Sequence, residues 1–206
     1  VQVALSICED IWEKHPTADA AEAGAEILLN LNSSPYHRGK RGERWEMVAE
    51  RARQAAFPIV YVNQVGGQDE LVFDGGSFVL SADRELQIQM PTFSATQITT
   101  QWSKSDRGWV CAPGEIEPVR EKTEQMLAAI YQAMVLGLRD YVTKNNFPGV
   151  ILGLSGGIDS GLSAAVAVDS IGAEKVHCVM MPSPYTSQDS LDDAGEQAGI
   201  LGITFD

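Results

Sequence analysis

The sequence predicts an α/β protein with two layered regions and a linker between them, at residues 1–100, 119–206 and 101–118 respectively. In the first region, β-branched apolar runs alternate with helix-like runs and are followed by Gly-rich turns, which is typical of a mixed layered domain. In the last region, strand, helix, strand and helix follow one another, which predicts a parallel sheet. Between them, from Pro91 to Pro118, apolar periodicity is lost and Ser, Thr and Pro accumulate, as in a linker that crosses the surface.

The charge balance limits the partners that this chain can have. Its 206 residues include 28 acidic and 15 basic side chains, which gives a formal net charge of −13. An acidic surface repels phosphates, so we expect no general nucleic-acid binding. A nucleotide ligand is still compatible, because local backbone N–H groups can outweigh the distant field. No apolar run reaches the roughly 18–20 residues of a membrane span, so we expect no membrane partner.

The cysteines and the chain ends give two further expectations. Cys8, Cys111 and Cys178 are far apart and form no C-x-x-C spacing, which fits neither a disulfide framework nor a zinc site. The reducing cytoplasm is therefore the expected location. The chain opens on an apolar run without a Met, and residues 203–206 resemble the start of a strand. We therefore expect a section of a longer protein.

The first region opens with a buried strand over residues 1–7, because this run is apolar and partly β-branched. The following elements are expected in order: a helix at about 17–25, a strand at 27–31, a helix at about 41–55 and a strand at 59–62. The longer helix has one apolar face, which we expect to be buried: Trp45, Val48, Ala49 and Ala52. Turns with paired glycines then separate three antiparallel pieces, at 71–73, 77–80 and 86–90.

The last region opens with a long amphipathic helix that follows a charge cluster at 120–124. Its apolar stripe, which we expect to pack in the core, recurs at helical spacing: Leu127, Tyr131, Met134, Leu138 and Tyr141. Residues 145–149 end this helix in a turn. The elements that follow are a strand at 150–152, a helix at 161–171, a strand at 176–181 and a helix capped by Ser187 or Ser190.

A Gly-rich stretch between the strand at 150–152 and the helix at 161–171 predicts a phosphate site. Glycines permit unusual turns and the close approach of a ligand, and free N–H groups at a helix start favour an anion. The stretch is neither a Walker loop, because no Gly-Lys-Ser/Thr follows, nor the dinucleotide G-x-G-x-x-G motif. The residues assigned to the site are Gly153, Leu154, Ser155, Gly156, Gly157, Ile158, Asp159 and Ser160.

Residues 155–160, Ser-Gly-Gly-Ile-Asp-Ser, resemble the PP-loop of the N-type ATP pyrophosphatases. The resemblance implies a doubly wound parallel sheet of the adenine nucleotide alpha-hydrolase-like type. It also implies cleavage of ATP between the α- and β-phosphates, adenylation of a carboxylate and displacement of AMP by ammonia. Residues 181–187 resemble the Met-Pro-Ser-x-Tyr-Thr-Ser pattern of NAD synthetases, which adds Met181 to the ATP site. Pro184 stands where that family often has a basic residue, so a contact between this position and the phosphates is not assigned.

Two roles are compatible with Asp159. A carboxylate beside a phosphate cradle is repelled unless a hard cation bridges the two, which makes Asp159 the candidate ligand for Mg²⁺. A role as the N-cap of the following helix fits the same position. ATP and Mg²⁺ are the expected cofactors, and both roles of Asp159 remain open.

Cys8 lies where a strand meets a turn, a position from which a nucleophile can be presented. On position alone, a free cysteine is more often a small buried hydrophobe. Its neighbours favour a function. The segments Ile-Cys-Glu-Asp-Ile-Trp at 7–12, Asn-Leu-Asn-Ser-Ser-Pro-Tyr-His at 30–37 and Gly-Lys at 39–40 resemble the carbon–nitrogen hydrolase, or nitrilase, superfamily. More narrowly, they and Phe-Asp-Gly-Gly-Ser-Phe at 73–78 are similar to the glutaminase domain of glutamine-dependent NAD synthetases.

This second resemblance assigns roles and a fold to the first region. It implies part of a nitrilase-like α-β-β-α sandwich in which Cys8 is the nucleophile, while Ser34 and Lys40 hold the glutamine. The superfamily's catalytic Glu and Lys lie upstream of the Cys, and only seven residues precede Cys8. Glu9 is no substitute, because successive strand residues point to opposite faces.

Taken together, the two resemblances cover nearly the whole chain and imply one enzyme class. It is a homo-oligomeric ligase that hydrolyses glutamine and, with ATP and Mg²⁺, adenylates and amidates deamido-NAD. Two alternatives stay open, namely another PP-loop amidotransferase or thiolase, and a non-catalytic scaffold that has kept the fold.

Overall fold

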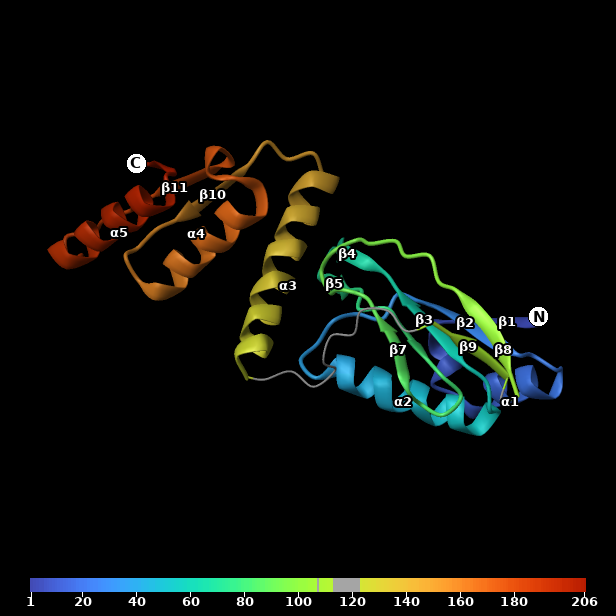
Figure 1. Ribbon diagram of the computed structural model, residues 1–206. Coiled ribbons are helices and arrows are strands. Elements are labelled where there is room, and N and C mark those ends of the chain that lie inside the picture. The colour runs from blue at the N-terminus through green and yellow to red at the C-terminus, as the bar shows by residue number, and fades with distance from the viewer. Residues whose placement is uncertain (107, 113–122) are drawn as a thin grey trace. The chain divides into compact units, whose positions relative to one another are not determined.

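The computed structural model describes residues 1–106, 108–112 and 123–206 (Figure 1). It divides into two compact units. The first contains residues 1–66 and the described part of 72–128, and the second contains residues 67–71 and 129–206. Residues 67–71 belong to the second unit, where the backbone N–H of Gly67 donates to Asp140 Oδ2 at 2.8 Å.

The first unit is built on a five-stranded sheet in the order β1-β2-β3-β6-β7. The helices up to residue 112 are the 3₁₀ helix η1 (Cys8–Ile11), α1 (Lys14–Glu22) and α2 (Lys40–Ala55). The strands are β1 (Val3–Ile7), β2 (Ile27–Asn32), β3 (Ile59–Asn63), β4 (Val65–Gln68), β5 (Leu71–Asp74), β6 (Phe78–Leu80), β7 (Leu86–Gln89), β8 (Trp102–Ser105) and β9 (Gly108–Cys111). The predicted strand and helix order of residues 1–90 is confirmed.

The register of the sheet brings three strand ends to one edge. β1, β2 and β3 run parallel, with Ile7 opposite Leu31 and Leu31 opposite Val62. β6 and β7 are antiparallel to their neighbours. Because parallel strands end at the same edge, the residues that follow β1 and β2 come out beside each other, which is where ligands bind in such sheets.

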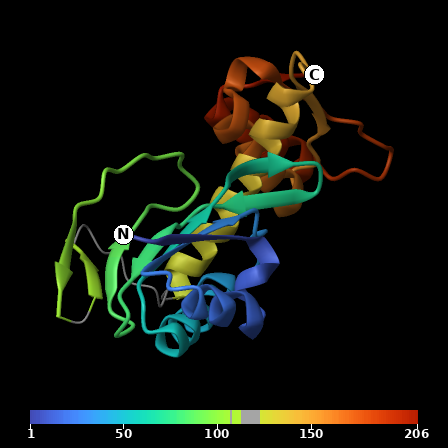
Figure 2. The ribbon, with the colours of Figure 1, turned by 90° about the vertical axis from the view of Figure 1, so that its right-hand side faces the viewer.

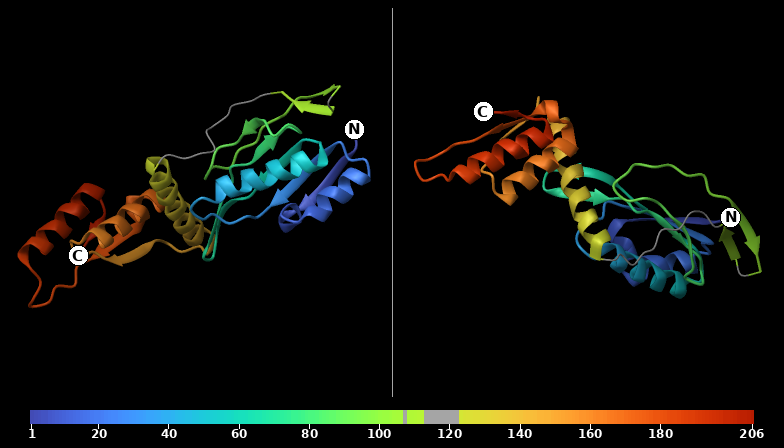
Figure 3. Two further views of the ribbon diagram at one scale, coloured as in Figure 1. Left: turned by 90° about the horizontal axis from the view of Figure 1, so that it is seen from below. Right: turned by 60° about the vertical axis from the view of Figure 1, so that its left-hand side comes forward.

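One face of this sheet packs on α1 and α2, which lie side by side (Figure 3). The core between them consists of buried residues from strands and helices: Leu28, Val48, Ala49, Ala52, Ile59, Tyr61, Phe78 and Leu80. The predicted buried face of α2 is confirmed, with Trp45 partly buried at its edge.

The short first helix starts earlier than expected. It spans Lys14–Glu22 rather than about 17–25, and Pro16 lies in its first turn. Proline is tolerated there because the first-turn N–H groups have no partner within the helix. The helix ends before Gly24, whose φ of +85° takes the chain out of the helical conformation.

Residues 102–105 and 108–111 form a paired hairpin rather than an irregular linker. β8 and β9 pair antiparallel, with Trp102 opposite Cys111. Cys111 and Trp102 pack against Val79 and Ile88, on the sheet face opposite α1 and α2, and Figure 2 shows the hairpin and the helices on different sides of the sheet. The expected linker residues 113–118 and the charge cluster at 120–122 lie outside the described residues.

The second unit contains a parallel sheet in the order β10-β11-β12. Its elements are α3 (Thr123–Lys144), which starts in the first unit, then β10 (Val150–Gly153), α4 (Ile158–Ile171), the 3₁₀ helix η2 (Ala173–Lys175), β11 (Val176–Val179), α5 (Gln188–Leu201) and β12 (Thr204–Phe205). α4 and α5 lie side by side (Figure 3) and pack, with the end of α3, on one sheet face. The predicted parallel strand–helix order is confirmed.

Three of the five residues in the predicted core stripe of α3 are exposed, while Leu138 packs against the core of the second unit. Leu127, Met134 and Tyr141 are 63%, 39% and 48% exposed. The buried residues of this helix in the described part are instead Ala129, Ala133, Leu136 and Val142. From Met126 to Leu138 only Gln132 is polar, so periodicity alone could not select a face of this helix. None of the described helices is long and apolar enough to cross a bilayer.

Candidate functional site

Cys8 follows β1 and opens η1 in a strained backbone conformation. Its φ is +50°, in the left-handed region that non-Gly residues rarely occupy. Asp10 stabilises this turn, because its Oδ2 accepts from the backbone N–H of Ile7 at 2.8 Å. Strain of this kind, which costs about 1–3 kcal/mol, clusters at active sites. Cys8 is half-buried, so its thiol is accessible at the edge where the parallel strands end.

The other two cysteines are core residues. Cys111 and Cys178 are 1% and 0% exposed. Burial raises the pKa of both thiols, which keeps them protonated and poor as nucleophiles. Cys178 belongs to the core of the second unit.

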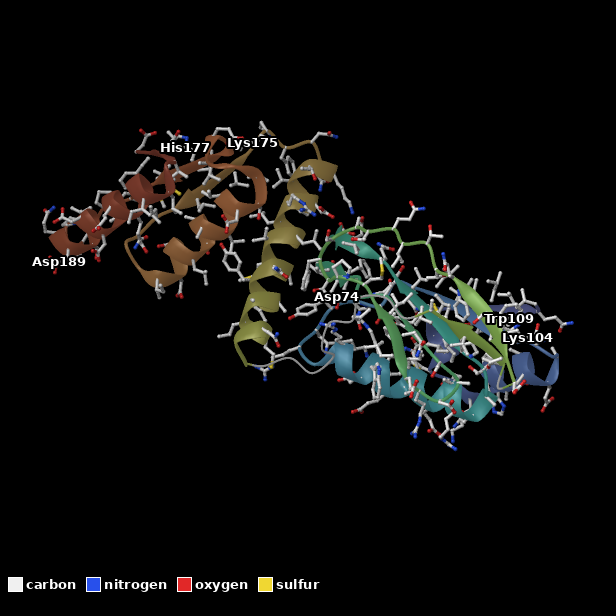
Figure 4. All side chains as sticks on the ribbon, in the orientation of Figure 1. Asp74, Lys104, Trp109, Lys175, His177 and Asp189 are labelled. Atoms are coloured by element: carbon white, nitrogen blue, oxygen red, sulfur yellow. The ribbon has the colours of Figure 1, made fainter. Side chains whose placement is uncertain are left out.

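Ser34 lies in the loop after β2, and both its backbone and its side chain are hydrogen-bonded. Its backbone N–H donates to Asn63 Oδ1 at 2.9 Å, and its carbonyl accepts from Asn63 Nδ2 at 3.2 Å. The guanidinium of Arg44 on α2 donates to the Ser34 hydroxyl and carbonyl oxygens. Asp74, at the end of β5 (Figure 4), pairs with Arg44 at 2.8 Å. This group of Ser34, Arg44, Asn63 and Asp74 is called the Ser34 network below.

Lys40 is the first residue of α2 and points back toward the turn that Cys8 opens. Its Nζ lies 4.3 Å from the ring centroid of Trp12, the C-cap residue of η1, and 3.2 Å from Glu43 Oε2. A cation over an aromatic ring is attracted by the ring quadrupole. The Lys40 ammonium is thus placed beside the turn that Cys8 opens, which is a suitable position for holding a polar substrate.

The hydroxyl of Tyr61 is a further polar group inside this unit. Tyr61 is fully buried, and the Ser34 side chain is one of the polar groups that act on its hydroxyl. Burial raises its pKa, while the positive charge of Arg44 acts in the opposite direction. The hydroxyl therefore stays protonated near the Ser34 network.

Sequence reasoning missed Arg44, Asn63, Asp74 and Tyr61. A helical arginine and an amide in an apolar strand look like surface residues until the fold shows that they are buried. One usable signal was present, because a charged residue at Arg44 lies next to the apolar face formed by Val48, Ala49 and Ala52. Buried charges need partners, so such a residue predicts a counter-ion.

The Gly153–Ser160 loop joins β10 to α4 and is closed by its own serines. Ser160 Oγ donates to the carbonyl of Gly157 at 2.9 Å, and the N–H of Ser155 donates to Ser160 Oγ at 3.2 Å. The N-cap of α4 is Gly157, so Ile158, Asp159 and Ser160 form the first turn. The N–H groups of a first turn have no partner within the helix, and together with the helix dipole they favour an anion.

Gly156 allows the close packing of this loop on α5. Its φ is +80°, and a Cβ there would overlap the carbonyl oxygen of Ser190. Gln197 on α5 donates to the carbonyl of Gly156 at 3.1 Å, which holds the loop from the same side. Only glycine combines this conformation with this contact.

A hollow of about 470 Å³ opens beside the loop. It is lined by Gly153, Leu154 and Ser155, by Met181 after β11, and by Ser187 and Ser190 at the start of α5. Ser187 caps α5 by accepting from the N–H of Ser190 at 3.2 Å, as predicted. The fold thus brings Met181 to the loop residues expected to bind ATP, at the carboxyl end of the parallel strands.

The geometry of Asp159 favours one of its two roles. It is the second residue of α4, the N-cap is Gly157, and no side-chain cap bond closes the helix. The described residues contain no cluster of three or more His, Cys, Asp or Glu side chains able to hold a metal. Mg²⁺ usually needs only one or two carboxylates, with substrate phosphates and water completing its shell. One exposed carboxylate beside a phosphate loop therefore fits Mg²⁺ brought in with ATP.

Two family models match the two parts of the sequence. The carbon-nitrogen hydrolase model matches residues 1–107, which is more than half of the chain. This chain belongs to the carbon–nitrogen hydrolase family. The NAD synthase model matches residues 130–206, the part that carries the phosphate loop. The expected order, a nitrilase-like region followed by a PP-loop region, is confirmed.

Curated relatives align with nearly all of this chain. A glutamine-dependent NAD(+) synthetase of Rhodobacter capsulatus is 44% identical over 206 residues, which is 100% of this chain and 37% of the relative. One from Acinetobacter baylyi is 44% identical over 97% of this chain and 36% of the relative. The chain therefore spans little more than a third of the length of these relatives.

Two solved structures also match nearly all of this chain. A glutamine-dependent NAD+ synthetase of Acinetobacter baumannii, in complex with ADP, matches with a TM-score of 0.90 and 46% identity. The match covers 98% of this chain and 38% of that one. A second such enzyme, from Cytophaga hutchinsonii, matches with a TM-score of 0.74 at 20% identity, which supports the fold alone.

Proposed function

We propose that this chain is a section of a glutamine-dependent NAD(+) synthetase. The observation that carries the proposal is the presence of two chemically distinct sites in one carbon–nitrogen hydrolase family chain. One is a strained cysteine at a strand end, beside the Ser34 loop. The other is a Gly-rich phosphate loop at a helix start, in the part that matches the NAD synthase model.

In the first site, Cys8 is the nucleophile for glutamine hydrolysis. Its sulfur attacks the side-chain amide carbon, the C–N bond breaks, and the nitrogen leaves as ammonia after gaining a proton. Water then hydrolyses the thioester to glutamate and restores the thiol. Ser34 and Lys40 hold the glutamine, and the proton transfers are assigned to the superfamily's upstream Glu and Lys, which this sequence does not include.

In the second site, ATP activates the carboxylate of deamido-NAD. The carboxylate oxygen attacks the α-phosphorus, pyrophosphate leaves, and ammonia then displaces AMP to form the amide of NAD. Backbone N–H groups at the start of α4 face the phosphates where negative charge develops. Preorganised donors of this kind are each worth about 3–4 kcal/mol. The hollow lined by Met181 and Ser155 receives the nucleotide.

Asp159 is the residue that would hold Mg²⁺ at this loop. When bound, the cation neutralises phosphate charge and so permits a carboxylate beside the triphosphate. In a full-length protein containing these residues, Asp159→Asn should lower NAD formation from free ammonia by about a hundredfold or more. Glutamine hydrolysis should be spared. NAD formation within about threefold of wild type would remove Asp159 from the metal site.

The cysteine is tested separately. In the same full-length protein, Cys8→Ala should abolish glutamine-dependent NAD formation and leave the ammonia-dependent reaction nearly intact, because the two sites perform separate chemistry. Equal losses with both nitrogen sources would mean that Cys8 is structural or that the two sites are obligately coupled. The nitrogen source is the only variable, so each variant is its own control.

Release of pyrophosphate separates this proposal from its two alternatives. With ATP, Mg²⁺, ammonia and deamido-NAD, the proposed enzyme releases pyrophosphate only when deamido-NAD is present. Another PP-loop amidotransferase or thiolase would release it with a different acceptor, and a scaffold would release none. We further propose that the protein works in the cytoplasm as a homo-oligomer.

A further inference from the structure

The Ser34 network centres on a guanidinium that uses all of its nitrogens. Arg44 is 2% exposed and Asp74 is 2% exposed. Arg44 Nη1 donates to Asp74 Oδ1 and Oδ2 at 2.8 and 3.0 Å. Nε donates to Ser34 Oγ at 3.0 Å, and Nη2 donates to the carbonyls of Ser34 and Pro35 at 2.7 and 2.9 Å. A buried charge is stable only when it is paired and hydrogen-bonded, and this arginine meets both conditions.

The Ser34 network fixes both the position of the Ser34 hydroxyl and the direction in which it donates a hydrogen bond. Asn63 and Arg44 bind the backbone N–H and carbonyl groups of Ser34, which fixes the backbone conformation of the loop at this residue. A serine hydroxyl has one hydrogen to donate and two lone pairs. Arg44 Nε–H donates to one lone pair of the Ser34 hydroxyl oxygen. The hydroxyl hydrogen is therefore directed away from the arginine. Tyr61, whose buried hydroxyl stays protonated, is the other polar group at Ser34 and can donate to the second lone pair. Ser34 therefore keeps its own hydrogen to donate, which suits a carboxylate or amide oxygen of the substrate.

We propose that Arg44, held by Asp74, is a positioning residue that makes Ser34 a fixed donor for glutamine. The inference rests on the proposed function, because it assigns Arg44 to the glutaminase half of that enzyme. Arg44 contacts Ser34, and the buried carboxylate of Asp74 fixes the orientation of the guanidinium from the opposite side. The planar fork of an arginine is required, since a lysine ammonium cannot reach Asp74, the hydroxyl and two carbonyls together.

Helix α2 supplies a matched control. Arg51 lies two turns after Arg44 and is 7% exposed. It also binds backbone carbonyls, those of Ile11 and Trp12 at 3.0 and 2.6 Å, but it makes no contact with Ser34. Arg44→Lys and Arg51→Lys thus make the same chemical change at equally buried positions of one helix, and only the first releases the Ser34 hydroxyl.

The experiment measures glutamine hydrolysis in a full-length protein that contains these residues. We expect Arg44→Lys to raise the KM for glutamine by about tenfold or more, with kcat within about threefold, because a lost ground-state contact weakens binding. Arg51→Lys, which loosens the turn of Cys8 and Trp12 rather than Ser34, should lower kcat more than it raises the KM. Ammonia-dependent NAD formation should be unchanged in both variants. Asp74→Asn, which keeps the shape of the side chain, gives the same test if Arg44→Lys does not fold.

A double mutant shows whether Arg44 acts through Ser34. Ser34→Ala should raise the KM as Arg44→Lys does, and combining the two should add nothing further, because both remove one interaction. The proposal is overturned if the two effects multiply, if Arg44→Lys leaves the KM unchanged, or if Arg51→Lys raises it equally. Failure of the proposed function looks different, since wild-type protein would then not hydrolyse glutamine at all.

Discussion

At the scale of single residues, the two sites share one property, which is a left-handed backbone conformation where chemistry is expected. Cys8 has φ +50° and Gly156 has φ +80°. The motif around Cys8 predicted a nucleophile, but no pattern in the sequence indicated its left-handed conformation. A glycine in a sequence often indicates a left-handed conformation, whereas a cysteine gives no such indication. The strain at Cys8 is therefore a cost that the site carries so that the thiol is presented from the end of β1.

This strain predicts an unusual order of stability for substitutions at Cys8. Cys8→Gly should be more stable than Cys8→Ala by about 1 kcal/mol, because glycine relieves a left-handed conformation that alanine retains. Both variants lose the same sulfur contacts, so each controls for the other. Thermal unfolding of the two full-length variants measures the difference. An alanine variant as stable as the glycine variant would mean that the turn relaxes without a penalty.

The Ser34 network marks the limit of sequence reasoning at this scale. Ser34 and Lys40 could be proposed as binding residues because a family motif includes them. Arg44 and Asn63 could not, and Asp74 lies in a family motif that gave it no role. The roles of all three depend on segments far apart in the chain that meet only in the fold. The same holds for Met181 and Gly153, which lie on different loops and meet at one hollow.

At the scale of elements, the β8–β9 hairpin was the main element that the sequence did not reveal. Its strands are four residues long, and three residues of β8 are exposed, so the hairpin has little apolar alternation to detect. The hairpin is held by contacts with distant residues. Lys104 Nζ lies 2.7 Å from Glu26 Oε1 and 5.9 Å from the Trp109 ring centroid, and Figure 4 shows the lysine and the tryptophan as neighbours.

The ion pair at Glu26 makes the docking of this hairpin depend on pH. The hydrogen bond from Lys104 lowers the pKa of Glu26 to about 2. A depressed carboxyl pKa stabilises the fold above the ordinary pKa of about 4.3, and this contribution is lost as pH falls through about 2. The stability difference between wild type and Glu26→Gln should therefore be constant above about pH 5 and shrink toward pH 2. Lys104→Met should reduce the pH dependence of that difference to the part that the backbone N–H of Gln2 contributes, and an unchanged pH dependence would exclude Lys104 as the main cause.

A hydrogen bond between Tyr131 on α3 and Asp169 on α4 gives the opposite dependence of stability on pH. Tyr131 Oη donates to Asp169 Oδ2 at 2.6 Å, which raises the pKa of Tyr131 to about 12. The contribution is complete below the ordinary pKa of about 10 and is lost as pH rises through about 12. Tyr131→Phe should therefore lower stability at neutral pH and lose its effect in strong alkali. Ultraviolet titration of the tyrosines provides the measurement, and a normal titration of Tyr131 would contradict the contact.

At the scale of the whole molecule, the chain leaves apolar sheet faces uncovered. Leu5 and Ile7 on β1 are 70% and 67% exposed, and Leu31 on β2 is 49% exposed on the same face. In the second unit, Ile151 on β10 is 76% exposed. Soluble proteins rarely expose contiguous apolar patches of this kind, and such patches mark surfaces that pack against something else.

We therefore expect the 206-residue chain by itself to associate and to be inactive in both half-reactions. Cys8 has no assignable general base in this sequence, and an unassisted thiol is a weak nucleophile. Light scattering of the purified chain measures association. Labelled glutamine, and separately ATP with Mg²⁺, ammonia and deamido-NAD, measure the two reactions. Steady ammonia release or NAD formation above Cys8→Ala and Asp159→Asn controls would show that the catalytic groups are misassigned.

The contact between Gly156 and the Ser190 carbonyl also has a genetic consequence. Glycine codons begin with GG, and a single base change at either position gives an amino acid with a Cβ or a stop codon. Every such Cβ meets the same carbonyl oxygen in the same left-handed conformation. In a library of single-base variants, position 156 should therefore lack tolerated missense alleles, whereas Gly195 and Gly199, where a Cβ meets nothing within 4 Å, should accept several.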